Sequence, residues 1–227
     1  MNVIKVIKKN TFLSARENAL QVLDSHGVEV GELVPIGAWA LKDENLIESF
    51  CAWRKLFMRF FLVQSESSIQ STYRYLDQLA IKSDDRILFA LYVDGILTGH
   101  IGLCDIGQDV AEADNIMRGK SGGHKDLMLL CEIALLNWSF ETLGVTRVMA
   151  RILSKNFLSQ ALFARLGFQT IDRMPLRKVI EDSRIIMRAC AHEHATETFT
   201  LDLLEVTKDK FIKQVELYKR TEENFLP

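Results

Sequence analysis

This chain of 227 residues has little proline, few cysteines and no large excess of either charge. It has 3 prolines and is 48% hydrophobic, which is the composition of a folded globular protein and not of a disordered one. Lys and Arg total 28 against 30 for Asp and Glu, so no broad positive field favours nucleic acid as a partner. The 4 cysteines include no C-x-x-C pair, so neither a zinc ribbon nor a dithiol redox centre is indicated.

A membrane-spanning run and an export signal are also missing from the sequence. The first residues, MNVIKVIKKN, lack the apolar core and the small-residue cleavage site of a signal peptide. The most apolar stretch, 127–140, is interrupted by Glu132 and Asn137 and is too short to cross a bilayer. Cysteines lie beside apolar residues such as Phe50 and Leu103, as buried, reduced thiols do. The sequence thus predicts a soluble, cytoplasmic protein without a membrane partner.

The N-terminal part of the chain has the patterns of helices and short strands. Ser14 and Glu17 form a capping-box pattern ahead of an apolar run, which predicts a helix over 14–24 that ends at Gly27. Asp43 is placed to cap a helix whose apolar residues recur at helical spacing. Also expected are strands within 28–41 around Pro35 and Gly37, a short strand at 60–63 and a helix over 67–80.

The next part contains the clearest hairpin of the sequence. Two apolar runs, 86–93 and 96–103, flank Asp94-Gly95, a preferred two-residue turn. After it we expect a strand at 110–117, a helix over 126–143, a strand at 146–153, a helix over 157–166, a strand from Gly167-Phe168, a polar stretch, a strand at 199–206 and an amphipathic tail. We therefore expect one domain at 31–206, an extension with one short helix at 1–30 and a tail at 207–227.

The segment IMRGKSGGHKDLMLL, residues 116–130, joins a predicted strand to a predicted helix through a glycine-rich turn. Such a turn directs backbone N–H groups and the positive end of the helix dipole to one point, where Arg118 and Lys120 add charge. It suits a phosphate or pyrophosphate, and a plain turn with solvated lysines is the alternative. The P-loop spacing fails because position 114 is Asp, and the dinucleotide spacing G-x-G-x-x-G fails as well.

Two motifs, taken together, resemble those of the GNAT family of acetyl-CoA-dependent N-acyltransferases. The ends of the loop motif R/Q-x-x-G-x-G/A are matched by Arg118 and Gly123, and the later motif is matched by Asn156, Ser159, Leu162, Gly167 and Phe168. The order of elements is similar over about residues 33–175. The resemblance implies an α/β (mixed α+β) fold: a three-layer αβα sandwich with a central mixed, largely antiparallel sheet, splayed between the strands at about 110–117 and 146–153.

Acetyl-CoA is the cofactor that this resemblance implies. Its pantetheine amides would hydrogen-bond the splayed strands, and its pyrophosphate would rest on the amides of 119–124. The residues expected to bind it are Met117, Arg118, Gly119, Lys120, Ser121, Gly122, Gly123, His124, Asn156, Ser159 and Phe163. Ser121 stands where the family has the middle glycine of the loop. Phe163 stands where many members have a tyrosine that protonates the leaving thiolate, so the thiolate must leave unaided or take a proton from another group or water.

The reaction that the resemblance implies also needs a proton acceptor, because an amine attacks a thioester only when it is neutral. Glu112 and Asp114 are two residues apart on a predicted strand, share a face and are the expected catalytic residues; a solvent-facing position for either is the alternative. His100 is a second candidate that could instead be a core or rim residue. His192 and His194 lack a third ligand at a sensible spacing, so no metal site is expected.

The segment CAWRKLFMRFF, residues 51–61, falls where GNAT members usually border the acceptor cleft. Its Trp-Arg pair resembles members that acetylate amino groups of nucleotide-linked sugars, and Arg54 or Arg59 could hold a diphosphate. The expected substrate-binding residues are Trp53, Arg54, Arg59 and His100, although Trp53 could be core and the arginines solvated. The expected reaction is acetyl transfer to the primary amine of an amino sugar, free or nucleotide-linked, in surface-polysaccharide biosynthesis.

Two other functions stay open at the level of sequence. The chain could acetylate a protein N-terminus or a lysine, which would favour an acidic cleft for basic peptides. It could also be a non-catalytic module that binds acyl-CoA or a partner, because Phe163 lacks a transferable proton. The terminal segments could cap the edge of the sheet or build a homodimer.

Overall fold

The computed structural model describes residues 3–223 of the chain. Within that range ten strands form one sheet in the order β1-β2-β4-β5-β6-β7-β10-β8-β9-β3. The strands are β1 Leu20–Leu23, β2 Glu29–Pro35, β3 Val63–Gln64, β4 Ile87–Val93, β5 Ile96–Cys104, β6 Val110–Arg118, β7 Arg147–Leu153, β8 Gln169–Glu181, β9 Arg184–Ala189 and β10 Thr200–Thr207. Neighbouring strands are antiparallel except β6 and β7, which run parallel. The sheet is therefore mixed and largely antiparallel, as predicted.

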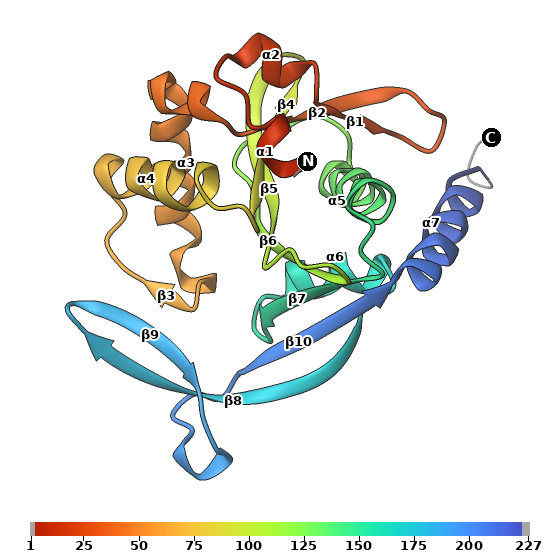
Figure 1. Ribbon diagram of the computed structural model, residues 1–227. Coiled ribbons are helices and arrows are strands. Elements are labelled where there is room, and N and C mark those ends of the chain that lie inside the picture. The colour runs from red at the N-terminus through yellow and green to blue at the C-terminus, as the bar shows by residue number, and fades with distance from the viewer. Residues whose placement is uncertain (1–2, 224–227) are drawn as a thin grey trace.

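Helices cover both faces of this sheet, with α3 and α4 on one side and α5 on the other (Figure 1). The α-helices are α1 Val3–Ile7, α2 Phe12–Arg16, α3 Glu44–Phe57, α4 Ile69–Tyr75, α5 Leu127–Trp138, α6 Phe157–Arg165 and α7 Lys208–Glu223. The 3-10 helices are η1 Ala38–Lys42, η2 Met58–Phe60 and η5 His192–His194, and the π-helices are η3 Leu76–Ile81 and η4 Ser139–Leu143. No described helix is both long and apolar enough to cross a membrane.

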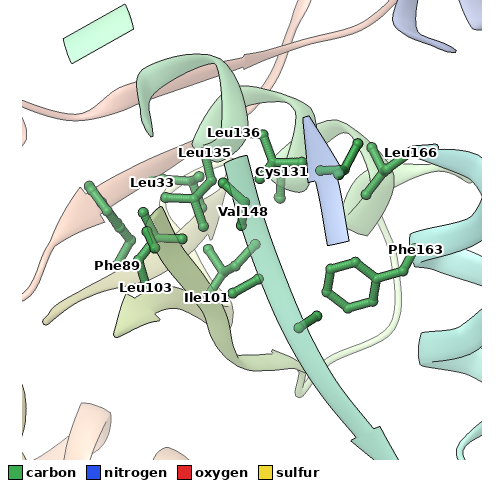
Figure 2. Close-up of a cluster of buried hydrophobic side chains, with 14 of the residues drawn as sticks. Leu33, Phe89, Ile101, Leu103, Cys131, Leu135, Leu136, Val148, Phe163 and Leu166 are labelled. Atoms are coloured by element: carbon green, nitrogen blue, oxygen red, sulfur yellow. The ribbon is translucent and has the colours of Figure 1, made fainter. Parts of the chain in front are cut away.

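The two faces of the sheet bury separate hydrophobic clusters, because side chains alternate along a strand. On β4, Phe89 and Leu91 join a cluster with α5, whereas Leu88 and Ala90 join a cluster with α3. Figure 2 shows part of the α5 cluster, which includes Phe89 and in which Leu135 lies next to Leu33. Both faces of β4 are thus buried, which explains why its sequence is apolar at every position from Ile87 to Val93.

Two predicted signals are confirmed in detail. Asp94 and Gly95 have φ values of 49° and 74°, so the β4–β5 hairpin closes through two left-handed residues. The Asp43 side chain accepts a hydrogen bond from the Leu46 N–H at 3.0 Å and caps α3. Local chemistry determined both features, which is why the sequence alone was sufficient to predict them.

The prediction of a helix over 14–24 is wrong. The Thr11 side chain, and not Ser14, caps α2, which ends at Arg16. The apolar residues that follow form β1, where Val22 is fully buried and pairs with Gly31 of β2. Cross-strand pairing and burial outweighed a local helix signal at this position.

Three other expectations also need correction. The region 28–41 contains one strand, because the Trp39 indole Nε1 donates to the Pro35 carbonyl at 3.0 Å and the chain turns into η1. The strand expected at 60–63 begins only at Val63, after η2. The strand expected from Gly167-Phe168 is present as β8, but the polar stretch expected after it instead contains β9, and the β8–β9 hairpin closes at Asp182 and Ser183, with φ values of 48° and 63°. Asp-Ser is a weaker turn signal than Asn-Gly or Asp-Gly, and it went unrecognised.

Candidate functional site

The parallel pair β6 and β7 separates partway along its length. Its ladder runs from Val110 opposite Arg147 to Ala113 opposite Ala150 and then stops. Both strands continue, β6 to Arg118 and β7 to Leu153, so their facing backbone groups beyond Ala113 have no ladder partner across the gap. An extended amide-bearing chain can hydrogen-bond such edges as an added strand.

A bulge in β6 lies where the strands diverge. The β5–β6 register shifts between His100 and Gly102, and Asn115 has a left-handed φ of 54°. His100 Nδ1 lies 2.6 Å from the Asn115 carbonyl oxygen, which can only accept, so Nδ1 carries the proton. Burial lowers the pKa of His100 to about 4, so its ring is neutral at pH 7. His100 therefore pins the bulge, and at 5% exposure it presents little surface to a substrate.

The loop after β6 begins with two backbone bonds that the sequence did not indicate. The N–H groups of Gly119 and Lys120 both donate to the Thr98 carbonyl, at 2.8 and 3.0 Å. A Cβ on Gly119 would collide with the Trp53 indole ring. These two N–H groups are therefore not available to an anion. Of the amides expected to bind the diphosphate, those of residues 121–124 remain.

The remaining part of the loop has the form of an anion cradle. The N–H groups of Ser121, Gly122, Gly123 and His124 donate to no protein acceptor within residues 3–223. Gly122 and Gly123 have φ values of 101° and 73°. The Arg118 guanidinium donates to the carbonyl oxygens of Lys120 and Gly122. Arg118 thus supports the shape of the loop with two of its five guanidinium N–H groups.

The other predicted cofactor residues take different positions. His124 accepts at Nδ1 from the Asp126 N–H at 3.1 Å, and Asn156 Oδ1 accepts from the Ser159 N–H at 3.3 Å as the cap of α6. Met117 and Phe163 are 5% and 1% exposed, and the Phe163 ring packs edge-on against Phe168 at 4.6 Å. Phe163, drawn in Figure 2, is a core residue without an exposed face for a cofactor, which corrects its expected role.

The predicted catalytic carboxylates each bind an arginine. Arg151 Nε donates to both oxygens of Glu112 at 2.8 Å, and Arg151 also pairs with Asp105 at 2.9 Å. Burial nevertheless raises the pKa of the Glu112 carboxyl. Oδ2 of Asp114 accepts from the Arg86 guanidinium and, at 2.5 Å, from the Asn115 side-chain amide. Neither carboxylate is the free base that the sequence suggested.

The acidic residues beside Arg151 could in principle hold a cation. Ligand atoms of Cys104, Asp105 and Glu112 lie within 4.8 Å of one another. The Arg151 guanidinium, however, already bridges both carboxylates, and burial raises the pKa of the Cys104 thiol, which keeps it protonated. The donor set therefore suits an arginine better than a metal ion.

The structure brings Trp53 and Arg54 to this site and leaves Arg59 outside it. Trp53 is 6% exposed and its ring lies 6.2 Å from that of His100. Arg54 donates to the Val63 carbonyl at 3.3 Å and stacks over the Phe61 ring at 4.3 Å, and it also lies within electrostatic range of Asp114. Arg59 is exposed and stacks over Phe60 at 4.8 Å.

Sequence reasoning missed Tyr75, Arg86, Thr98 and Arg151 as parts of the site. Arg86 directly precedes an apolar strand and Arg151 lies in the middle of one. An arginine at the edge of the core needs an acidic partner, and this was the available signal for both residues. Thr98 acts through its main-chain carbonyl, which no side-chain pattern can reveal.

Comparisons with known proteins agree with this geometry. The family model described as Acetyltransferase (GNAT) domain matches residues 36–169. A GCN5-related N-acetyltransferase from Brucella melitensis is 17% identical with a TM-score of 0.64, over 84% of this chain and 81% of that chain. The N-acetyltransferase PseH of Campylobacter jejuni, solved with acetyl coenzyme A, is 15% identical with a TM-score of 0.52, over 78% of this chain and 99% of that one.

A third solved structure is that of a spermidine N-acetyltransferase from Vibrio cholerae in complex with CoA and spermine. It is 12% identical with a TM-score of 0.61, over 81% of this chain and 98% of that chain. No curated protein matches the sequence significantly. Because the family model covers more than half of the chain, and the sheet, its splayed strands and the loop have the expected arrangement, the chain belongs to the GNAT family and is an N-acetyltransferase whose acetyl donor is acetyl-CoA.

Proposed function

We propose that this enzyme acetylates the primary amine of a small amino sugar, free or nucleotide-linked, in surface-polysaccharide biosynthesis. When bound, acetyl-CoA supplies an acetyl group activated as a thioester. The observation that carries the proposal is the Trp53–Arg54 pair beside the divergence of β6 and β7, where Asp114 is already bound by Arg86 and Arg54 forms no salt bridge with a carboxylate in the described chain. A basic peptide or a polyamine would favour the opposite balance of charge.

The residues that would hold the cofactor follow from the free backbone groups. The unpaired edges of β6 and β7 beyond Ala113 would bind the pantetheine amides. The amides of Ser121 to His124, with Lys120 nearby, would bind the diphosphate. The Asn156 side-chain amide nitrogen, at the start of α6, would contact the pantetheine arm, and Ser159 would hold Asn156 in place.

Proton removal from the acceptor amine is assigned to the carboxylate pair on β6. Burial raises the pKa of the Glu112 carboxyl, and Asp114 is the first residue of β6 beyond the last paired position, Ala113. The proton acceptor is thus Glu112 or Asp114, acting directly or through water. Because Phe163 donates no proton, the CoA thiolate leaves unaided or takes a proton from water.

Binding of acetyl-CoA and acetyl transfer test the proposal in sequence. Acetyl-CoA at a concentration far above its Kd should raise the Tm of the protein, because only the folded state binds it. Release of free CoA thiol should then depend on an added acceptor, with nucleotide-linked amino sugars faster than free amino sugars and basic peptides slowest.

The same assay identifies the proton acceptor. The responsible variant, Glu112→Gln or Asp114→Asn, should lose at least tenfold in kcat/KM near neutral pH. Glu205→Gln, which breaks a similar cross-strand pair with Arg147 on β7, serves as the control and should not slow transfer. Unchanged transfer rates in both test variants would exclude Glu112 and Asp114 as the proton acceptor. Faster acetylation of a basic peptide than of any amino sugar would overturn the proposal that the acetyl acceptor is an amino sugar.

A further inference from the structure

The Tyr75 hydroxyl is a buried polar group whose O–H finds no hydrogen-bond acceptor in the part of the chain that the structure describes. Within residues 3–223 no group accepts a hydrogen bond from its O–H; the Arg86 guanidinium is near enough to its oxygen to lower the pKa of Tyr75 as a donor does, and the residue as a whole is partly exposed. Tyr75 is the last residue of α4, and the π-helix η3 begins directly after it with Leu76 fully buried. Isolated π turns are uncommon and recur at functional sites. An orphaned buried hydroxyl is destabilising, so its retention calls for an explanation.

The surroundings of this hydroxyl carry more positive than negative charge. Arg54, Arg86 and Asp114 are the charged groups that act on Tyr75. Asp114 is already bound by Arg86, and His100 beside it is neutral. Arg54 has the Val63 carbonyl and the Phe61 ring as its contacts but no carboxylate in a salt bridge within the described chain. One guanidinium charge therefore stays uncompensated in a partly buried position.

An unused O–H donor and an uncompensated guanidinium together describe the complement of an anion. Burial raises the pKa of Tyr75, so the phenol keeps its proton at neutral pH and can donate. A carboxylate or phosphate oxygen accepts strong hydrogen bonds from both kinds of group. The cluster lies beside Asp114, where β6 and β7 begin to diverge, which is where the acceptor must approach.

We propose that Tyr75 and Arg54 bind an anionic oxygen of the acceptor, from a phosphate or a carboxylate, and so select acceptors that carry a negative charge. This inference rests on the proposed acetyltransferase function and adds a specificity-determining residue that the sequence did not single out. Polyamines and uncharged amines are poor acceptors on this basis, because they leave the Tyr75 hydroxyl and the Arg54 charge unpaired.

The test uses the full chain saturated with CoA, so that the cofactor loop is already filled. Inorganic pyrophosphate and succinate are titrated separately by calorimetry, which tells a phosphate site from a carboxylate site. One or both should bind the wild type, and Tyr75→Phe should weaken that binding about tenfold or more, the loss of one hydrogen bond to a charged group. Tyr73→Phe makes the same change at an exposed position of α4 and should bind like the wild type.

A second pair of variants guards against damage to the fold. Arg54→Gln should also weaken the binding of the anion, by about tenfold or more. Lys55→Gln, at the exposed next position of α3, should bind the anion like the wild type. Tyr75→Phe should keep or raise the Tm, since it removes an unpaired hydroxyl. If neither anion binds the wild type, or Tyr75→Phe and Arg54→Gln bind as the wild type does, the inference is overturned. Failure of CoA itself to raise the Tm would instead overturn the cofactor site of the proposed function.

Discussion

Glu132 lies in the middle of α5 with 0% exposure, and neither of its carboxyl oxygens has a hydrogen-bond partner in the described chain. Burial raises its pKa from the usual 4.5 to about 8. The carboxyl is therefore neutral in the folded protein at pH 7 but ionised in the unfolded chain. The sequence showed only an acidic residue that interrupts an apolar run, and the core around it decides its protonation state.

Replacing Glu132 by Gln should make the stability of the protein less dependent on pH. Below pH 4.5 the carboxyl is protonated in both states and makes no difference. Between pH 4.5 and 8 only the unfolded state ionises, so the wild type loses up to about 1.4 kcal/mol of its free energy of unfolding per pH unit, and above pH 8 the loss levels off.

Urea unfolding at a series of pH values checks this, with exposed Glu193→Gln as the control. The difference between Glu132→Gln and wild type should widen from pH 5 to pH 8. A constant difference over that window would mean that Glu132 is not the titrating group.

At the scale of elements, the loop between β6 and α5 takes its shape from glycines in left-handed conformations. Gly122, in this loop, and Gly144, after η4, have φ values of 101° and 74°. An added Cβ would meet nothing within 4 Å at either position. Both sites therefore place a similar demand on the backbone, and they differ in whether the neighbouring amides are free to bind an anion.

Gly122→Ala and Gly144→Ala should destabilise the protein alike, by about 1–2 kcal/mol each, because both force alanine into the left-handed region. Only Gly122→Ala should weaken the binding of acetyl-CoA, by about tenfold or more, because the amides of 121–124 would no longer point to one place. Calorimetric titration of acetyl-CoA measures this directly. Equal affinity in the two variants would mean that the diphosphate rests elsewhere.

At the scale of the whole molecule, the C-terminal segment forms the helix α7, which follows β10 directly (Figure 1). Phe211 is 1% exposed and its ring lies 5.5 Å from that of Phe140. Further along, Tyr218 approaches Asp126 at 3.5 Å, and Glu222 pairs with Lys125 at 3.1 Å, directly after the anion loop. The tail thus packs on its own chain, although it lies beyond the residues matched by the family model.

Phe211→Ala should lower the free energy of unfolding by about 3–5 kcal/mol, as expected for a buried aromatic side chain. Ile212→Ala, at a neighbouring position that is 40% exposed, should lower it by about 1 kcal/mol or less. Denaturant unfolding of both variants compares the two positions. A small loss at Phe211 would show that α7 is a detachable tail and not part of the core.

The predictable part of this protein consists of features that neighbouring residues decide. The Asp94-Gly95 turn, the Asp43 cap and the glycine loop each depend on a few adjacent side chains, so their residue types are enough to predict them. β1 and β9 were missed because hairpin pairing with the neighbouring strands β2 and β8, and not a strand signal in their own residues, holds them in place.

By itself the sequence determined the family, the order of most elements in the central domain and the loop that would receive the cofactor. Only the tertiary structure decided how the charges are used. It gave Glu112 and Asp114 an arginine each, occupied the first two loop amides with the Thr98 carbonyl, and left the Tyr75 O–H without an acceptor in the described chain, within electrostatic range of Arg54. The physical reason is that hydrogen bonds and ion pairs act over a few ångströms in space, between residues that are far apart in the chain.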